Sequence, residues 1–109
     1  MAPRLLQIRF KLRGVTPAEY EQASTQAAQR IAAVPGLRWK VWPLSDDDEA
    51  GGMYLFDDEA SLRAYVDGPI VEHLKHAPFV EELSIREYGV IESLTAITRG
   101  PAVTAEATA

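Results

Sequence analysis

Residues 36–56 read GLRWKVWPLSDDDEAGGMYLF, and this stretch says most about the fold. Two aromatic-rich apolar runs flank an acidic segment that ends in Gly51-Gly52. The pattern is typical of a β-hairpin with a solvated tip. It predicts strands near residues 37–43 and 50–56.

The sequence before the hairpin predicts one strand and one helix. Apolar and polar residues alternate over residues 6–12, as in a half-buried strand. Thr16 then suits a helix N-cap and Pro17 the first helical position. An apolar stripe with spacings of three and four continues to about residue 34, so we expect the helix to end there.

After the hairpin, the carboxylates of residues 57–59 can cap a second helix. Its apolar stripe runs from Leu62 to Leu74, and Gly68-Pro69 interrupts it, so we expect two helical pieces. A last strand is predicted for residues 79–90. The resulting order, β-α-β-β-α-β, is that of a ferredoxin-like α+β sandwich, in which both helices cover one face of a four-stranded antiparallel sheet.

Length and composition indicate one small domain. The 109 residues are 47% hydrophobic and 25% charged, which is ordinary for a globular protein. We expect the domain to cover residues 1–99 and a loose tail to cover residues 100–109, where no apolar period is present. The net charge of −5 argues against a nucleic-acid partner, and no apolar run is long enough for a membrane span. Without cysteines or a signal-peptide pattern, we expect a cytoplasmic protein.

The alternation within each strand predicts which side chains face the helices. We expect these to be Leu6, Ile8, Phe10, Leu37, Trp39, Val41, Leu83 and Ile85. We expect the open face to carry Gln7, Arg9, Lys11, Arg38, Lys40, Trp42, Ser84, Arg86 and Tyr88. The strand over residues 50–56 is ambiguous, because both sets of alternate positions are apolar. A bulge near Gly51-Gly52 or Gly89 would shift these assignments by one residue.

The open face is expected to combine cations with aromatic rings. The residues concerned are Arg9, Lys40, Arg86, Trp42, Tyr54 and Tyr88. Such a surface suits a planar anionic or phenolic ligand, because rings stack on its faces and cations favour its deprotonated form. These residues can instead be solvated surface groups whose aliphatic stems cover apolar area.

The hairpin also resembles that of a known family. Trp39-Lys40-Val41-Trp42, followed by Glu-Ala-Gly-Gly-Met-Tyr-Leu-Phe at residues 49–56, resembles the signature of the YdhR family of the antibiotic-biosynthesis monooxygenase superfamily. Similar segments extend the resemblance over roughly residues 4–98; they are Leu5-Leu6-Gln7, Ala64-Tyr65 and Glu92-Ser93-Leu94-Thr95. Members form dimeric α+β barrels in which two ferredoxin-like sheets pack their open faces together. The resemblance therefore implies a homodimer with a pocket in each half, either between sheet and helices or within the barrel, and no flavin, haem or metal cofactor.

From this resemblance we expect a cofactor-independent monooxygenase that acts on a small aromatic or polyketide-like molecule, with dioxygen as its second substrate. Dioxygen accepts an electron from an electron-rich carbanion or phenolate, so the protein need only remove a proton, stabilise the anion and exclude water. The candidates for catalytic residues are His73, Tyr54 and Arg86. The expected substrate-binding residues are Arg9, Trp39, Lys40, Trp42, Tyr54, Arg86 and Tyr88.

Two other functions stay open. A non-catalytic barrel would bind a small ligand in the same aromatic pocket without turnover. A haem-degrading enzyme of the same fold would need a histidine facing the haem, which His73 or His76 could supply. We expect no metal site, because these histidines do not form a His-Glu-x-x-His motif and the stretch from Asp46 to Asp57 lacks calcium-loop ligands at Ala50 and at its last position.

Overall fold

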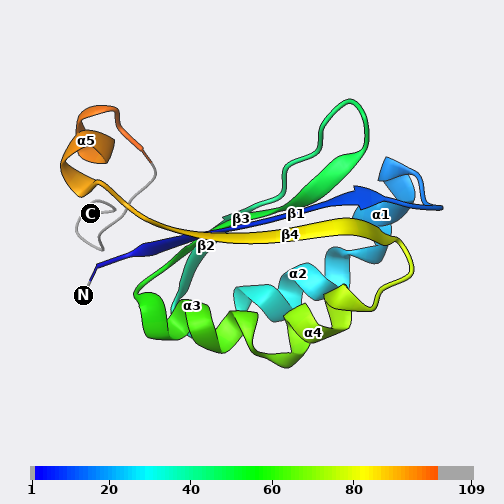
Figure 1. Cartoon of the computed structure of the whole chain (residues 1–109), viewed down its shortest axis with the longest axis horizontal. Coiled ribbons are helices and arrows are strands. Elements are labelled where there is room, and N and C mark those ends of the chain that lie inside the picture. Colours follow the sequence, from blue (N-terminus) through cyan, green and yellow to red (C-terminus); the bar gives the residue numbers. More distant parts are fainter. Residues whose placement is uncertain (1, 101–109) are drawn as a thin grey trace.

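The computed structural model describes residues 2–100 (Figure 1). The predicted tail at residues 100–109 therefore lies outside the described residues, apart from Gly100. The elements in chain order are β1 (Arg4–Leu12), α1 (Pro17–Ala23), α2 (Thr25–Ala32), β2 (Leu37–Val41), β3 (Glu49–Phe56), α3 (Glu59–Val66), α4 (Pro69–Lys75), β4 (Val80–Gly89) and α5 (Glu92–Ile97).

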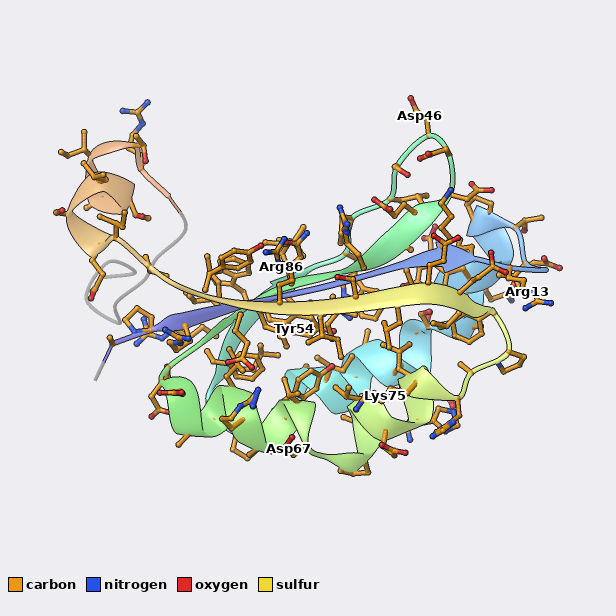
Figure 2. All side chains as sticks on the ribbon, viewed as in Figure 1. Arg13, Asp46, Tyr54, Asp67, Lys75 and Arg86 are labelled. Carbon is orange, nitrogen blue, oxygen red and sulfur yellow. The ribbon has the colours of Figure 1, made fainter. Side chains whose placement is uncertain are left out.

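The strands form one antiparallel sheet in the order β2-β3-β1-β4. Helices α1 to α4 lie along one face of this sheet, and α5 lies beyond the end of β4 (Figure 1). This is the ferredoxin-like α+β fold that the element order predicts. Side chains leave the sheet on both faces, with Tyr54 directed toward the helices and Arg86 away from them (Figure 2).

The helices begin, and are interrupted, largely at the residues where the sequence predicts it. Thr16 forms a capping box with Glu19, in which the Thr16 Oγ1 accepts from the Glu19 N–H at 3.1 Å and Glu19 Oε1 accepts from the Thr16 N–H at 2.8 Å. The predicted first helix is divided into α1 and α2 at Ser24, where ψ is −4° rather than the helical value near −42°. The break at Gly68-Pro69 is confirmed, whereas the short α5 was not predicted. None of the helices within residues 2–100 is long and apolar enough to cross a membrane.

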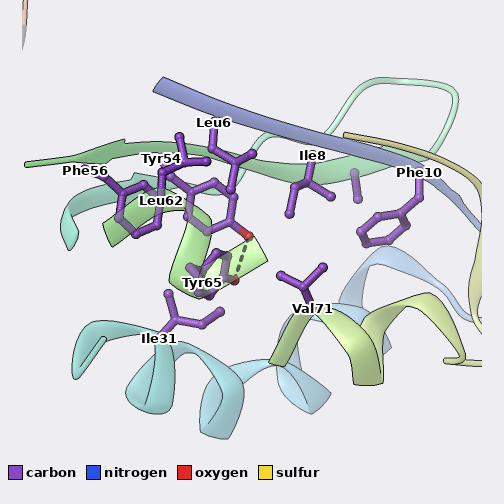
Figure 3. Close-up of a cluster of buried hydrophobic side chains, with 10 residues drawn as sticks. Leu6, Ile8, Phe10, Ile31, Tyr54, Phe56, Leu62, Tyr65 and Val71 are labelled. Carbon is purple, nitrogen blue, oxygen red and sulfur yellow. Dashed lines mark hydrogen bonds between the residues drawn. The ribbon is translucent and has the colours of Figure 1, made fainter. Parts of the chain in front are cut away.

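The hydrophobic core lies between the sheet and helices (Figure 3). Its buried members are Leu6, Ile8, Phe10, Ile31, Ala50, Tyr54, Phe56, Leu62, Tyr65 and Val71. The predicted helix-facing side of the first strand is therefore confirmed. The ambiguity of the third strand is resolved by pairing, because Tyr54 lies opposite Leu6 and shares its face.

The prediction for the second strand was wrong from Trp39 onward. The register between β2 and β3 shifts between Leu37 and Trp39, so the extra residue is accommodated in a bulge. A one-residue shift moves every later side chain to the other face of the sheet. Lys40 consequently pairs with Tyr54 and faces the helices, whereas Trp39 pairs with Leu55 on the open face.

The same shift reverses the two residues that follow. Val41 was expected in the core, yet its side chain is on the open face and 54% exposed. Trp42 was expected on the open face, yet its ring lies 6.4 Å from that of Tyr20 in α1. The sequence suggested bulges near Gly51-Gly52 or Gly89, but the bulge that decides these faces is in β2.

Candidate functional site

A cavity of about 460 Å³ lies between the sheet and the helical layer. Strands β1, β2 and β3 form one wall, and residues from α1 to α4 form the other. Most of its described lining is apolar or aromatic, and no carboxylate is among those side chains. The polar groups that line it belong to Tyr20, Ser24, Arg30, Lys40, Trp42, Tyr54, Tyr65 and His73. A concave, mainly apolar space with a few converging polar groups is typical of a small-molecule site.

Lys40 extends its amine between aromatic rings of this cavity. Its Nζ lies 3.2 Å from the ring centroid of Trp42 and 4.7 Å from that of Tyr54. Ring faces attract a cation, so these contacts stabilise the protonated amine. Burial acts in the opposite direction and lowers the pKa of Lys40 to about 7. Both the charged and the neutral amine are therefore accessible near neutral pH.

Gly52 provides the space that Lys40 occupies. A Cβ at this position would lie 2.5 Å from Lys40 Cε and 2.7 Å from Tyr54 Cε1. Cβ atoms do not approach other carbons so closely, so any larger residue here requires the lysine or the ring to move. The second glycine of Gly51-Gly52 thus has a packing role beside the site rather than a role in binding phosphate.

Tyr54 and Tyr65 form a hydroxyl pair in the wall of the cavity. Tyr65 Oη donates to Tyr54 Oη at 3.1 Å, and the two ring centroids lie 5.2 Å apart (Figure 3). Burial raises the pKa of both phenols, so both remain protonated at neutral pH. Two hydroxyl protons are present and the mutual hydrogen bond uses one, so the pair can donate the other to a ligand oxygen.

A cluster of aromatic rings forms a further part of the cavity wall. The Tyr20 ring contacts Phe10, Phe79 and Trp42, with centroid distances of 6.1, 6.1 and 6.4 Å. Trp42 is 36% exposed, and together with Tyr20 it also lines an adjoining cavity of about 590 Å³ beside α1. These rings offer flat apolar surfaces to a planar ligand.

The predicted site residues are divided between the two faces of the sheet. Lys40, Trp42, Tyr54 and His73 line the cavity. The remaining members, Arg9, Trp39, Arg86 and Tyr88, do not line it and lie on β1, β2 and β4 with their side chains on the open face.

The residues on the open face interact mainly with one another. Arg86 lies with its Cζ 6.0 Å from the Tyr88 ring centroid, and Tyr88 Oη donates to Gln7 Oε1 at 3.2 Å. Arg9 Nη1 lies 3.9 Å from a carboxylate oxygen of Glu49, and this pair is largely exposed. These four residues therefore do not lie with Lys40, Trp42 and Tyr54 around this cavity.

The two histidines also differ in position. His73 faces the cavity from α4, whereas His76 Nε2 lies 2.9 Å from Glu72 Oε2 on the exposed side of the helix. Among residues 2–100, no three histidine or carboxylate side chains are grouped so that they could hold a metal ion.

Sequence reasoning missed Tyr20, Tyr65 and Arg30 as cavity residues. Both tyrosines were assigned to the apolar stripes of their helices, and they do pack against the core. A signal was nevertheless present, because a tyrosine on an inward-facing stripe brings a hydroxyl that requires a partner. No comparable signal marks Arg30, which is exposed on α2 and reaches the rim.

Comparison with protein families matches residues 5–101 to the family described as "Putative mono-oxygenase ydhR". No curated protein matches the sequence.

Solved structures share the fold. One is a protein of unknown function from Nitrosomonas europaea, with 19% identity, a TM-score of 0.71, and 84% of this chain and 91% of that chain covered. Another is a dimeric ferredoxin-like protein of unknown function from Thermobifida fusca, with 21% identity, a TM-score of 0.63, and coverages of 83% and 93%. A third is SnoaB, a cofactor-independent oxygenase from Streptomyces nogalater, with 17% identity, a TM-score of 0.68, and coverages of 84% and 95%. At these identities the likeness shows the fold alone.

Proposed function

Since this chain belongs to the ydhR monooxygenase family, we propose that it oxidises a small aromatic or polyketide-like molecule with dioxygen and without a bound cofactor. The observation that carries this function is the cavity beneath the sheet, where the Lys40 amine lies between the rings of Trp42 and Tyr54. The similar fold of the cofactor-independent oxygenase SnoaB is consistent with it. The chain has no cysteine, which suits a reducing compartment, and we place the activity in the cytoplasm.

The chemistry requires an electron-rich anion. A phenol or enol that loses its proton can transfer an electron to dioxygen, whereas the neutral molecule reacts poorly. Conversion of a ring CH₂ group to a carbonyl then consumes one dioxygen and releases one water, and the substrate itself supplies all the electrons. The protein must therefore bind the ring, stabilise the oxyanion and exclude water.

Residues of the cavity can perform these tasks. Trp42 and Tyr20 provide ring faces on which a planar substrate stacks. The protonated amine of Lys40 and the unused hydroxyl proton of the Tyr54 and Tyr65 pair stabilise the oxyanion. The apolar remainder of the wall keeps the anion out of water and so strengthens these interactions.

We assign a different role, at the interface of a homodimer, to the predicted site residues on the open face: Arg9, Trp39, Arg86 and Tyr88. They lie on the face of the sheet that α1 to α4 leave uncovered, beside the exposed Val41. A second copy of the chain would bury this face, and the similar Thermobifida fusca protein is dimeric.

Sedimentation of the purified chain tests the homodimer directly. The wild type should sediment as a dimer and Val41→Glu as a monomer, whereas a wild-type particle of 12.0 kDa would contradict the interface.

Oxygen consumption tests the activity. Purified protein without added cofactor is mixed with a panel of hydroxylated aromatics and anthrones, and dioxygen uptake is recorded with an electrode. We expect uptake with at least one compound, and its loss in Lys40→Met but not in Lys75→Met, which changes an exposed lysine of α4. Tight binding of a compound without any uptake would instead support a non-catalytic binding protein.

A haem titration separates the remaining alternative. His73 lines the cavity and is the histidine that a haem-degrading enzyme would use. A Soret shift on addition of haem that disappears in His73→Ala would favour that function. An unchanged haem spectrum would favour the oxidation of smaller aromatic molecules.

A further inference from the structure

We infer that Lys40 is the proton acceptor of this cavity: its neutral amine takes the proton of a bound phenol or enol, and the anion stays paired with the ammonium group. This role rests on the proposed function for its choice of ligand. It gives the proton transfer to a residue outside the catalytic candidates His73, Tyr54 and Arg86 that the sequence suggested, and it selects substrates that carry an acidic O–H group.

The position of Lys40 favours a base rather than a permanent cation. Its Nζ is directed into the cavity between Trp42 and Tyr54, and the backbone beside it is a glycine that leaves room for the side chain. Among the described residues, no carboxylate lies within ion-pair distance of the amine or lines the cavity. A buried lysine without a counter-ion loses its proton more readily than one in water, so the neutral form is populated.

The other titratable groups around the cavity are less suited to accept a proton. Tyr20 on α1, Tyr65 on α3 and Tyr54 on β3 are phenols whose pKa burial raises, so they act as donors. Arg30 on α2 carries a guanidinium group, which donates hydrogen bonds and offers no acceptor for a proton. Among the described residues that line the cavity, His73 on α4 is the remaining competitor, but it is exposed to solvent. Positive charge on Arg30 or His73 would further favour the neutral amine.

The proton transfer is balanced within the cavity. The substrate O–H bond breaks, its electron pair stays on oxygen, and a new N–H bond forms on Lys40. The ammonium group is held over the Trp42 ring, and the oxyanion accepts hydrogen bonds from it and from the tyrosine pair. No oxidant is needed for this step, because dioxygen enters only after the anion has formed.

A chromogenic phenol tests the assignment without turnover. 3-Nitrophenol, a weaker acid than Lys40, absorbs differently as phenol and as phenolate, so the spectrum of the bound probe reports its ionisation at a pH where the neutral amine is populated. At about one pH unit below the pKa of the free probe, about a tenth of it is ionised in solution. In the wild type, we expect the phenolate fraction of the bound probe to be at least fivefold greater than that of the free probe. In Lys40→Met, this fraction should fall to the solution value or below. Lys75→Met should behave as the wild type, His73→Gln tests the competing base, and circular dichroism confirms that each variant folds.

The amine itself can be followed without any ligand. In an NMR titration of the lysine side chains, the resonance lost in Lys40→Met should titrate near neutral pH. Phenolate that persists in Lys40→Met, its loss in His73→Gln, failure of the wild type to bind the probe, or a Lys40 amine still protonated at high pH would each overturn the assignment. Because neither measurement requires oxygen, phenolate formation by a protein that consumes no oxygen with any compound of the substrate panel would refute the oxygenase function and leave Lys40 as the proton acceptor.

Discussion

Replacing Lys40 with methionine should remove a specific pH dependence from the stability of the protein. In the folded chain, burial lowers the pKa of Lys40 from 10.5 to about 7. Between these values the unfolded state binds a proton that the folded state does not, so wild-type stability rises as the pH increases from about 7 to 10.5. This stabilisation is fully present above 10.5 and is lost as the pH falls toward about 7. Methionine has no proton to bind, so the variant lacks this dependence.

The size of the effect follows from the pKa difference and the ring contacts. A difference from 10.5 to about 7 corresponds to a cost of about 5 kcal/mol for the folded state at acidic pH. Contact of the ammonium group with the Trp42 and Tyr54 rings offsets about 0.5–2 kcal/mol of this cost. We therefore compare the free energy of unfolding of Lys40→Met with that of the wild type. The difference in favour of the variant should be about 3–4 kcal/mol larger below neutral pH than at alkaline pH.

Urea unfolding followed by circular dichroism at a series of pH values measures this difference. Both proteins are compared at one concentration, so that any subunit association contributes equally. The change in packing caused by methionine is independent of pH and shifts the whole curve, so only its slope is diagnostic. Lys75→Met serves as the control, because that lysine is exposed on α4. Parallel curves for the wild type and Lys40→Met would refute the reasoning, since Lys40 would then bind its proton equally in both states.

Three further substitutions test other parts of the structure. Gly52→Ala places a Cβ 2.7 Å from Tyr54 Cε1, so we expect the free energy of unfolding in urea to fall by about 1–3 kcal/mol. An unchanged value would mean that the side chains of the cavity wall rearrange without cost. Tyr65→Phe leaves the buried Tyr54 hydroxyl without its partner and should lower the free energy of unfolding by about 1–2 kcal/mol; an unchanged value would show that this hydrogen bond adds nothing to stability. Thr16→Ala removes the N-cap of α1 and should cost about 1 kcal/mol, visible as a lower Tm; an unchanged Tm would show that the cap adds nothing to stability.

Much of the fold follows from local sequence signals. The capping box at Thr16, the interruption at Gly68-Pro69 and the alternation over residues 6–12 each act within a few residues, so they can be read without knowing the partner elements. The order of these elements then admits few topologies, and the ferredoxin-like sheet is one of them.

The composition of the site depended on tertiary structure. Lys40 and Trp42 were identified as binding residues from the sequence, but on the wrong face and grouped with Arg9 and Arg86. The register shift between Leu37 and Trp39 moves them beneath the sheet, where they meet the tyrosines of the helices.

The physical reason is that side chains along a strand alternate with a period of two, so one extra residue exchanges the faces of all those that follow. Where that residue is inserted depends on how β2 pairs with β3, and pairing is a property of two segments rather than of either alone. The sequence by itself thus determined the order of the four strands and of the helical segments that cover the sheet, but not the division of the first helix or the short α5. Only the pairing of β2 with β3 decided that a lysine, and not a valine, enters the space between sheet and helices.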